Sequence, residues 1–219
     1  MRNTIFTLII LTAALPCFAQ GAAATPAASV TQPASVVQPV VYPKSYMVMG
    51  QGSLSADEMA AWLVNANNEI DMDFARDFAA LYIQEAALEG VNHDVAFSQM
   101  CLETGFLRFN RVVKQDANNF GGLGALNPSM PGERFSTVGT GVRAHIQHLK
   151  AYGSTAPLRQ KLVDPRYYYV RYGSAPSIYD LSGKWAADTA YGEKLKDIID
   201  RAYYLAGKNP GATVAFSGE

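Results

Sequence analysis

The sequence predicts one predominantly helical domain with a short β-hairpin, placed after an N-terminal leader and a spacer. Apolar residues recur at helical spacing in several segments, and typical capping residues stand at the ends of these segments. One long stretch, residues 106–135, is rich in Gly, Asn and Pro, which favours loop and a hairpin. The 219 residues are 49% hydrophobic and 17% charged, which suits a single domain with a real core.

Residues 1–19 have the features of a signal peptide. Arg2 precedes an apolar run, residues 5–15, that is too short to span a bilayer, and Ala19 follows at a plausible cleavage site. We expect export to the periplasm or cell envelope, with a secreted or surface location left open, and no membrane span after cleavage. Lipid anchoring through Cys17 is the alternative, and Pro16 before it fits poorly.

The rest of the chain divides by composition. Residues 20–53 are rich in Pro, Ala and Val and predict a flexible linker, residues 54–206 predict the domain, and residues 207–219 predict a disordered tail. Cleavage of the leader would leave Cys101 as the only cysteine, so we expect a buried thiol and no intrachain disulfide.

The first two helices are predicted by caps and by periodicity. Ser55 and Glu58 have the spacing of a capping box and open a helix to about Asn67. A second helix runs from Asp71 to Glu89, where Gly90 stops it. Apolar residues recur along this second helix at helical spacing: Phe74, Phe78, Leu81, Tyr82 and Leu88.

Three further helices follow. Asp94 can cap a helix from Val95 to about Thr104 that is apolar almost all round, which predicts burial. The next helix starts at Thr137 and ends at Gly153. The last carries its apolar face on Leu195, Ile198, Ile199, Ala202 and Leu205.

Glu103 is the one acidic residue near the end of the buried third helix. Apolar neighbours withhold solvation, and the negative end of the helix dipole also disfavours a carboxylate, so its pKa should be raised. A carboxyl that stays protonated near neutral pH suits general-acid catalysis at a glycosidic oxygen. The alternative is an exposed Glu103, or one paired with Arg108 or Arg111.

Four segments together resemble one enzyme family. They are "VAFSQMCLETGF", then "NNFGGLGA" from Asn118, then "GVRAHIQHLKAY" from Gly141, and "WAADTAYGEKLKDII" from Trp185. Their order and spacing, over about residues 91–205, resemble the bacterial endo-β-N-acetylglucosaminidases of glycoside hydrolase family 73. The resemblance implies an α+β, predominantly helical, lysozyme-like fold of two lobes, here with a small, short β-lobe.

The resemblance also implies an activity. Family members cleave peptidoglycan at the β-1,4 bond on the reducing side of N-acetylglucosamine, and their Gln-x-x-x-Glu-(Ser/Thr)-Gly segment places the catalytic acid at Glu103. The second acid, where one is proposed, corresponds to Glu133, whose alternative is a surface charge beside Arg134. A second carboxylate or the acetamido group of the substrate could complete the mechanism.

The resemblance implies further site residues. Tyr191 corresponds to a tyrosine that faces the catalytic centre. Asn118 and Asn119 could bind sugar or merely turn the chain, and Phe120 should fill the core beneath the groove. Among the aromatic residues from 167 to 185, Tyr172 and Trp185 are the candidates for stacking on sugar rings.

Asp188 is a groove candidate that would also serve as N-cap of the last helix. The sequence departs from the family pattern at Trp185, where Tyr is usual, and at Ala187, where Thr is usual.

Other functions are less favoured. A net charge of −1 argues against nucleic acid, and peptidoglycan glycan strands are the expected partner. No cofactor is expected. His145 and His148 lie three residues apart on a helix, but no carboxylate follows at metal-ligand spacing. A lytic transglycosylase that uses Glu103 and a non-catalytic peptidoglycan-binding module remain alternatives.

Overall fold

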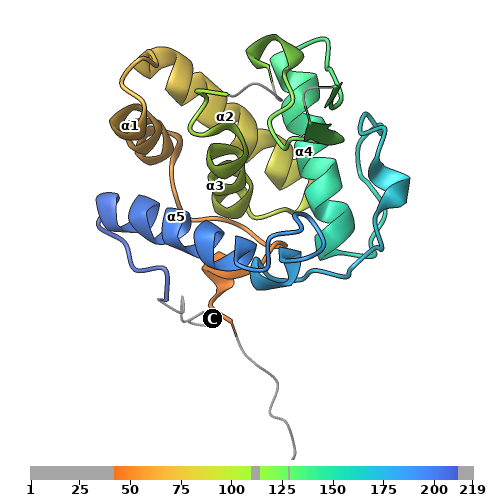
Figure 1. Ribbon diagram of the computed structural model, residues 1–219. Coiled ribbons are helices and arrows are strands. Elements are labelled where there is room, and N and C mark those ends of the chain that lie inside the picture. Colours follow the sequence, from red (N-terminus) through yellow and green to blue (C-terminus); the bar gives the residue numbers. More distant parts are fainter. Residues whose placement is uncertain (1–41, 110–113, 128, 212–219) are drawn as a thin grey trace, which may run out of the picture. The chain divides into compact units, whose positions relative to one another are not determined.

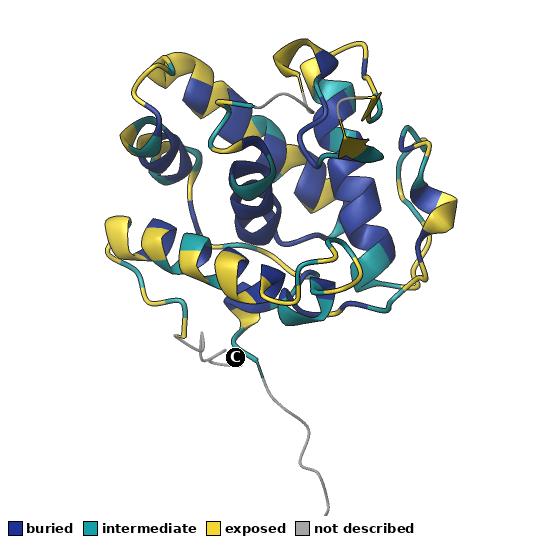
Figure 2. Ribbon diagram, in the orientation of Figure 1, coloured by how far each residue is buried: buried dark blue, intermediate teal, exposed yellow. Residues whose placement is uncertain are grey.

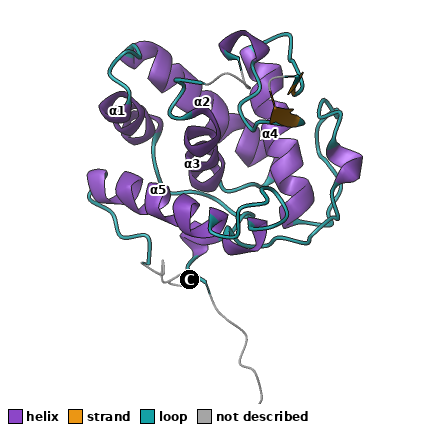
Figure 3. Cartoon of the chain, in the orientation of Figure 1, coloured by secondary structure: helices purple, strands orange, loops and turns teal. Residues whose placement is uncertain are grey.

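The predicted helices and hairpin are all present in the computed structural model, which describes residues 42–109, 114–127 and 129–211 (Figures 1 and 3). The five α-helices of this part of the chain are α1 (Ala56–Ala66), α2 (Met72–Glu89), α3 (His93–Thr104), α4 (Val138–Gly153) and α5 (Tyr191–Leu205). The two strands, β1 (Ala125–Asn127) and β2 (Met130–Pro131), pair antiparallel. The α+β, predominantly helical class is therefore confirmed.

Helix α3 is the centre of the core. It contacts α2, α4 and α5, and all of its residues except Leu102 and Glu103 are buried (Figure 2). The Phe97 ring packs against those of Phe78 and Tyr82 on α2. Burial of a helix on all sides matches its apolar composition, and it carries Glu103 to the edge of the core.

Several predicted helix ends are confirmed, and side-chain caps are found at three of them. Ser55 and Glu58 form a reciprocal capping box at the start of α1. Asp71 caps α2, and Gly90 ends it in the left-handed conformation at φ 75°. Thr137 caps α4. These bonds satisfy backbone N–H groups that have no partner within the helix.

Two predicted caps are wrong. The N-cap of α3 is Asn92, and the buried Asp94 carboxylate instead accepts hydrogen bonds from Ser53 N, Leu54 N and the Tyr203 hydroxyl. Helix α5 begins after Ala190, which makes no side-chain cap bond. Asp188 lies one turn earlier. Both carboxylates lie near a helix start in sequence. Asp94 instead accepts from groups distant in sequence, and Asp188 accepts from the turn before α5.

The buried face of α2 includes fewer residues than the apolar spacing in the sequence predicts. Phe78 and Tyr82 are buried, but Phe74 is 47% and Leu88 43% exposed. At 100° per residue the buried side of the helix is centred near Ala75 and Tyr82, so Phe74, about 90° away, falls at its edge, and Leu88, about 130° away, falls outside it.

The folded region begins upstream of residue 54, the boundary expected from composition. Tyr46 and Val48 are buried, and Val48 forms backbone hydrogen bonds with Pro176 and Asn92. The end of the expected linker is thus packed on the domain. At the other end, Lys208 of the expected tail forms an ion pair with Glu58.

The sequence features upstream of residue 42, including the signal peptide and Cys17, lie outside the described residues. Cys101 is buried, as expected, and burial raises the pKa of its thiol. No helix in the described ranges is long and apolar enough to cross a membrane.

The hairpin belongs to a small lobe with its own core. Leu123, Phe135 and Ala144 form a buried cluster against which Val163 and Trp185 pack. Gly141 on α4 lies so close to the Asn118 carbonyl that a Cβ there would overlap it. Because Gly141 has no side chain, the small lobe can pack directly against α4. This packing brings its 121–124 loop beside Glu103 at the end of α3.

Candidate active site

Glu103 is held at the end of α3 by two side chains from the C-terminal part of the chain. Its Oε1 accepts a hydrogen bond of 2.5 Å from the Tyr191 hydroxyl and one of 2.9 Å from Trp185 Nε1. Arg108, a predicted alternative partner, donates instead to the Ala66 carbonyl. Arg111 lies outside the described residues. The sequence separation of these contacts shows that only folding assembles the site.

Burial raises the pKa of the Glu103 carboxyl, and the hydrogen bonds from Tyr191 and Trp185 partly oppose that rise. The residue itself is half-buried, at the edge of the core. Its place in the last turn of α3 adds the unfavourable end of the helix dipole. The direction of the pKa shift is the one expected from sequence, and it keeps the acid form present at higher pH than for an exposed glutamate.

A glycine loop runs against Glu103 on its other side. A Cβ built on Gly122, whose φ is +62°, would lie 3.2 Å from Glu103 Oε2. A Cβ on Gly121 would lie 2.8 Å from a His145 ring carbon and 3.3 Å from Trp185. The loop can pass here because both residues lack a side chain. No hydrogen bond from another described residue reaches Oε2, which lies on the side of the glycine loop.

A groove begins at this loop. One pocket of about 280 Å³ is lined by the 121–126 loop together with His148, Arg166 and Trp185. A second, of about 600 Å³, includes Tyr172. The two pockets share four lining residues, Tyr152, Tyr169, Val170 and Lys184, and so form one continuous depression. Concave sites with aromatic walls and a few polar groups are typical of sugar-binding sites.

Glu133 approaches the same loop. Its Oε1 would lie 3.3 Å from a Cβ on Gly124, two residues from the glycine that approaches Glu103. Glu133 pairs with Arg166 at 3.5 Å, whereas Arg134 pairs with Asp116. Glu133 is partly exposed and does not pair with Arg134, and the two carboxylates, Glu103 and Glu133, flank one short segment.

The asparagine turn has a structural role. Asn119 is fully buried; its Nδ2 donates to the Leu123 and Glu133 carbonyls, and its Oδ1 accepts from Leu123 N. Asn118 adopts φ 49° and donates to the Phe135 carbonyl. Phe120 is buried beneath the loop. Of the two roles expected for Asn119, its burial and these bonds favour the one that turns the chain, and Phe120 is buried as its expected core position requires.

Two other predicted residues lie away from Glu103. Tyr172 is 38% exposed at the far end of the groove, where its ring packs on Tyr167. Asp188 accepts from Ala190 N and pairs with Lys194, and the Lys194 hydrogen bond lowers the pKa of its carboxyl. The Asp188 carboxylate is thus held by the Ala190 N–H of the same turn and by Lys194.

Sequence reasoning missed three buried residues behind Tyr191. Gln99 Nε2 lies 3.0 Å from the Tyr191 hydroxyl, and Gln99 Oε1 lies 3.0 Å from His145 Nε2. His145 Nδ1 lies 2.9 Å from the Tyr82 hydroxyl. A polar Gln99 one helical turn before Glu103, in an otherwise apolar helix, was the available signal.

The two histidines of α4 have separate side-chain partners. His145 contacts Gln99 and Tyr82, and His148 Nδ1 lies 2.7 Å from one oxygen of the buried Asp164. Among the described residues there is no group of three or more His, Cys, Asp or Glu side chains arranged to hold a metal ion.

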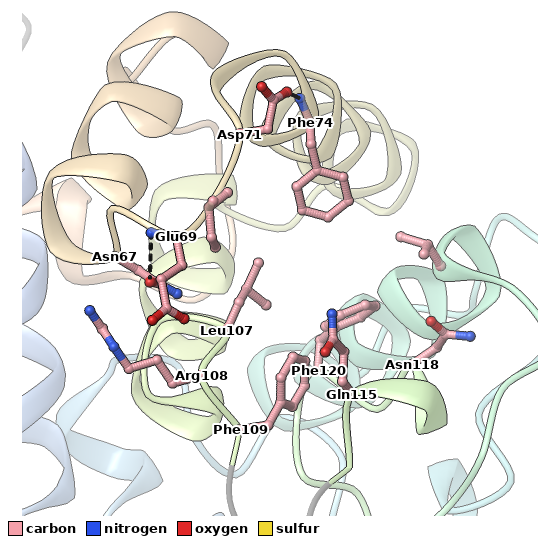
Figure 4. A pocket seen from close by; sticks show the side chains of 12 residues that line it. Asn67, Glu69, Asp71, Phe74, Leu107, Arg108, Phe109, Gln115, Asn118 and Phe120 are labelled. Carbon is pink, nitrogen blue, oxygen red and sulfur yellow. Dashed lines mark hydrogen bonds between the residues drawn. The ribbon is translucent and has the colours of Figure 1, made fainter.

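A separate pocket of about 610 Å³ lies between α2 and the segment after α3 (Figure 4). It shares no lining residue with the groove. Phe74, Phe109 and Phe120 supply its apolar wall, and Glu69 and Arg108 stand at its polar side. This position accounts for the exposure of Phe74, which faces a cavity at the edge of the core.

Comparison with known proteins identifies relatives for most of this chain. The family model Glucosaminidase, described as mannosyl-glycoprotein endo-beta-N-acetylglucosaminidase, matches residues 79–204. An uncharacterized protein of Borreliella burgdorferi is 44% identical over 152 residues, which are 69% of this chain and 74% of that protein.

Two solved structures of S. aureus autolysin E are also similar. One contains a muropeptide, NAM-L-Ala-D-iGlu, and aligns with a TM-score of 0.48 at 15% identity over 80% of this chain and 79% of the other. The second is a catalytic mutant with the disaccharide NAG-NAM, with the same TM-score and identity over 77% and 76% of the two chains.

Proposed function

Because the chain belongs to the glucosaminidase family, as its resemblance to glycoside hydrolase family 73 predicted, we propose that it hydrolyses peptidoglycan on the reducing side of N-acetylglucosamine. The observation that carries this proposal is the state of Glu103. Burial raises its pKa, two donors hold Oε1, and Oε2 lies beside Gly122, which lines the groove. The names of the autolysin E complexes, which contain peptidoglycan fragments, agree with this substrate class.

Glu103 acts as the general acid in this proposal. Its Oε2 proton passes to the glycosidic oxygen as the bond from that oxygen to C1 of the sugar breaks. The leaving sugar thereby departs as a neutral alcohol. Trp185 and Tyr191 stabilise the carboxylate that remains, since both donate to Oε1.

Glu133 is the proposed base. It takes a proton from the water that attacks C1, so that one water is consumed for each bond broken. Support comes from its approach to the glycine loop beside Glu103 and from Arg166, which pairs with it. The competing route uses the acetamido group of the substrate as nucleophile and needs no second carboxylate.

The test is digestion of purified peptidoglycan, analysed by mass spectrometry and by NMR of the fresh product. Reducing-end N-acetylglucosamine is expected from the wild type and none from Glu103→Gln. Anhydro-muramic ends would instead identify a lytic transglycosylase, and a wild type that binds but never solubilises peptidoglycan would identify a binding module. Inversion at C1, with loss of activity in Glu133→Gln, supports Glu133. Retention, with an active Glu133→Gln variant, supports the acetamido route.

The same proposal places the enzyme outside the cytoplasm, because its substrate is part of the cell envelope. The signal features of residues 1–19 support export. Mass spectrometry of the mature protein should find an N-terminus near Gln20. A mature chain that keeps residues 1–19 or carries lipid on Cys17 would contradict cleavage at this position.

A further inference from the structure

A chain of buried hydrogen bonds leads from α2 to Glu103 through four helices. Tyr82 on α2 contacts His145 on α4, His145 contacts Gln99 on α3, and Gln99 contacts Tyr191 on α5. Tyr191 then bonds to Glu103. Tyr82, Gln99 and His145 have no exposed surface, and Tyr191 is 4% exposed. A network closed to water must satisfy its donors and acceptors internally.

The chemistry of the Gln99 amide determines which group donates and which accepts in each hydrogen bond of this network. Its Nε2 donates to the Tyr191 hydroxyl, so its Oε1 faces His145 and can only accept. His145 Nε2 must therefore carry the proton. Burial, and secondarily His148, lowers the pKa of His145 to about 3, so the ring is neutral and Nδ1 accepts from the Tyr82 hydroxyl.

The direction continues to Glu103. Tyr191 receives a hydrogen bond from Gln99, and its own hydroxyl proton has Glu103 Oε1 as acceptor. Trp185 Nε1 can only donate, and it donates to the same oxygen. Oε1 thus accepts two hydrogen bonds, which leaves Oε2 as the oxygen that carries the acidic proton, beside Gly122.

We propose that Tyr82, His145 and Gln99 are positioning residues that keep the acidic proton of Glu103 on Oε2, where it faces the substrate. This inference rests on the proposed role of Glu103 as general acid. If the Gln99 amide were reversed, its oxygen would accept the Tyr191 proton, and Glu103 would donate from Oε1 to Tyr191. The acidic proton would then point away from the glycine loop.

The first test is ¹⁵N NMR of the two ring nitrogens of His145 in the whole protein after removal of the leader. A neutral ring protonated on Nε2 and bare on Nδ1, from about pH 5 to pH 8, is the expected result. A ring protonated on Nδ1, or on both nitrogens, would overturn the proposed direction. This measurement needs no substrate.

The second test is Gln99→Glu, which keeps the size of the side chain but replaces the donor by an acceptor. The new carboxylate takes the Tyr191 proton, so we expect kcat to fall at least about tenfold with KM within about threefold. The added charge and the lost hydrogen bond also raise the pKa of Glu103, so the alkaline limb of the pH profile moves upward. Among the described residues, the other titratable groups near this network are His145 with its neighbour His148, Tyr82 with its neighbour Cys101, and, across the glycine loop, Glu133.

Gln147→Glu is the matched control. Gln147 is also fully buried, but it bonds to the Lys161 carbonyl and to Val163 N, away from Tyr191. This variant should lose stability without a shift of the pH profile. Tyr82→Phe, which removes one hydroxyl, should lower kcat by a smaller factor, and its stability can be compared with that of Tyr203→Phe, which also loses one buried hydroxyl donor.

The outcomes separate the two proposals. A wild type that releases no reducing ends from peptidoglycan refutes the proposed function, while the His145 tautomer remains measurable. An active wild type whose Gln99→Glu variant keeps kcat within about twofold, with an unmoved alkaline limb, refutes the positioning role. If Gln99→Glu does not fold, the His145 spectrum and the kcat of Tyr82→Phe decide, and a kcat unchanged in Tyr82→Phe counts against the proposal.

Discussion

Gly122 lies against Glu103 so closely that a Cβ built on it would be 3.2 Å from Oε2. The glycine therefore leaves room at the oxygen that we propose carries the acidic proton. A methyl group there would crowd this oxygen and also strain a backbone at φ +62°. The contact joins the loop of the hairpin lobe to the end of α3.

Gly122→Ala should lower kcat/KM at least about tenfold, because the added methyl group blocks the approach of the glycosidic oxygen to Oε2. Gly105→Ala is its control, with a similar φ of +60° but nothing within 4 Å of the added carbon. Both variants should lose about 1–2 kcal/mol of stability from left-handed strain. Equal activity of the two, measured by reducing-end release, would contradict the steric argument.

Tyr191→Phe should move the alkaline limb of kcat/KM to higher pH. The lost hydrogen bond stabilises the ionised form of Glu103, so its removal raises the pKa of that carboxyl further. We also expect kcat to fall about 10- to 100-fold, since the remaining carboxylate is less well stabilised during bond cleavage. A pH–rate series on solubilised peptidoglycan measures both. A limb that moves to lower pH would be inconsistent with this role.

Glu103→Gln should change how stability depends on pH. A raised pKa in the folded state means that wild-type stability is full at pH below the unfolded pKa and is lost as pH rises through the folded pKa. The amide does not ionise, so the Tm of the variant relative to wild type should increase with pH. Asp188→Asn should behave oppositely, because the pKa of Asp188 is lowered by Lys194 and its contribution is lost as pH falls. Thermal melts at several pH values test both signs.

Asn119→Ala should destabilise the fold, because it leaves the Leu123 N–H and the Glu133 carbonyl without the Asn119 partner and removes one of two donors to the Leu123 carbonyl. The loss of such buried hydrogen bonds costs about 1–3 kcal/mol for each unsatisfied group, so the urea midpoint should fall clearly. Asn127→Ala, at an exposed position of the hairpin, should have a much smaller effect. Unchanged stability in Asn119→Ala, with weaker glycan binding, would restore the sugar-binding interpretation.

Tyr172→Ala should affect long substrates more than short ones. The residue lies at the far end of the groove, so a glycan strand can reach it while a small muropeptide bound at Glu103 does not. The loss of one stacking contact of about 1 kcal/mol predicts a several-fold rise in KM for polymeric peptidoglycan. Tyr204→Ala, at an exposed position on α5, should leave KM unchanged for both substrates.

The sequence by itself predicted the five helices, the short hairpin and the burial of the helix that carries Glu103. These features depend on local patterns, because apolar spacing and capping residues act within one or two helical turns. Glu103 was also identifiable, since a lone acid at the end of an apolar helix is unusual. The misplaced caps at Asp94 and Asp188 show the limit of such patterns, because the sequence does not reveal which distant donors reach a carboxylate.

Only the tertiary structure decided how the site is assembled. Tyr191 and Trp185 meet Glu103 across 88 and 82 residues of sequence, and both bond to the same oxygen. The Tyr82–His145–Gln99 chain links three helices, and packing rather than local propensity sets its geometry. Packing also turned Asn119 inward to hold the loop. Long-range contacts of this kind follow from how helix faces fit together, which residue spacing along one chain does not encode.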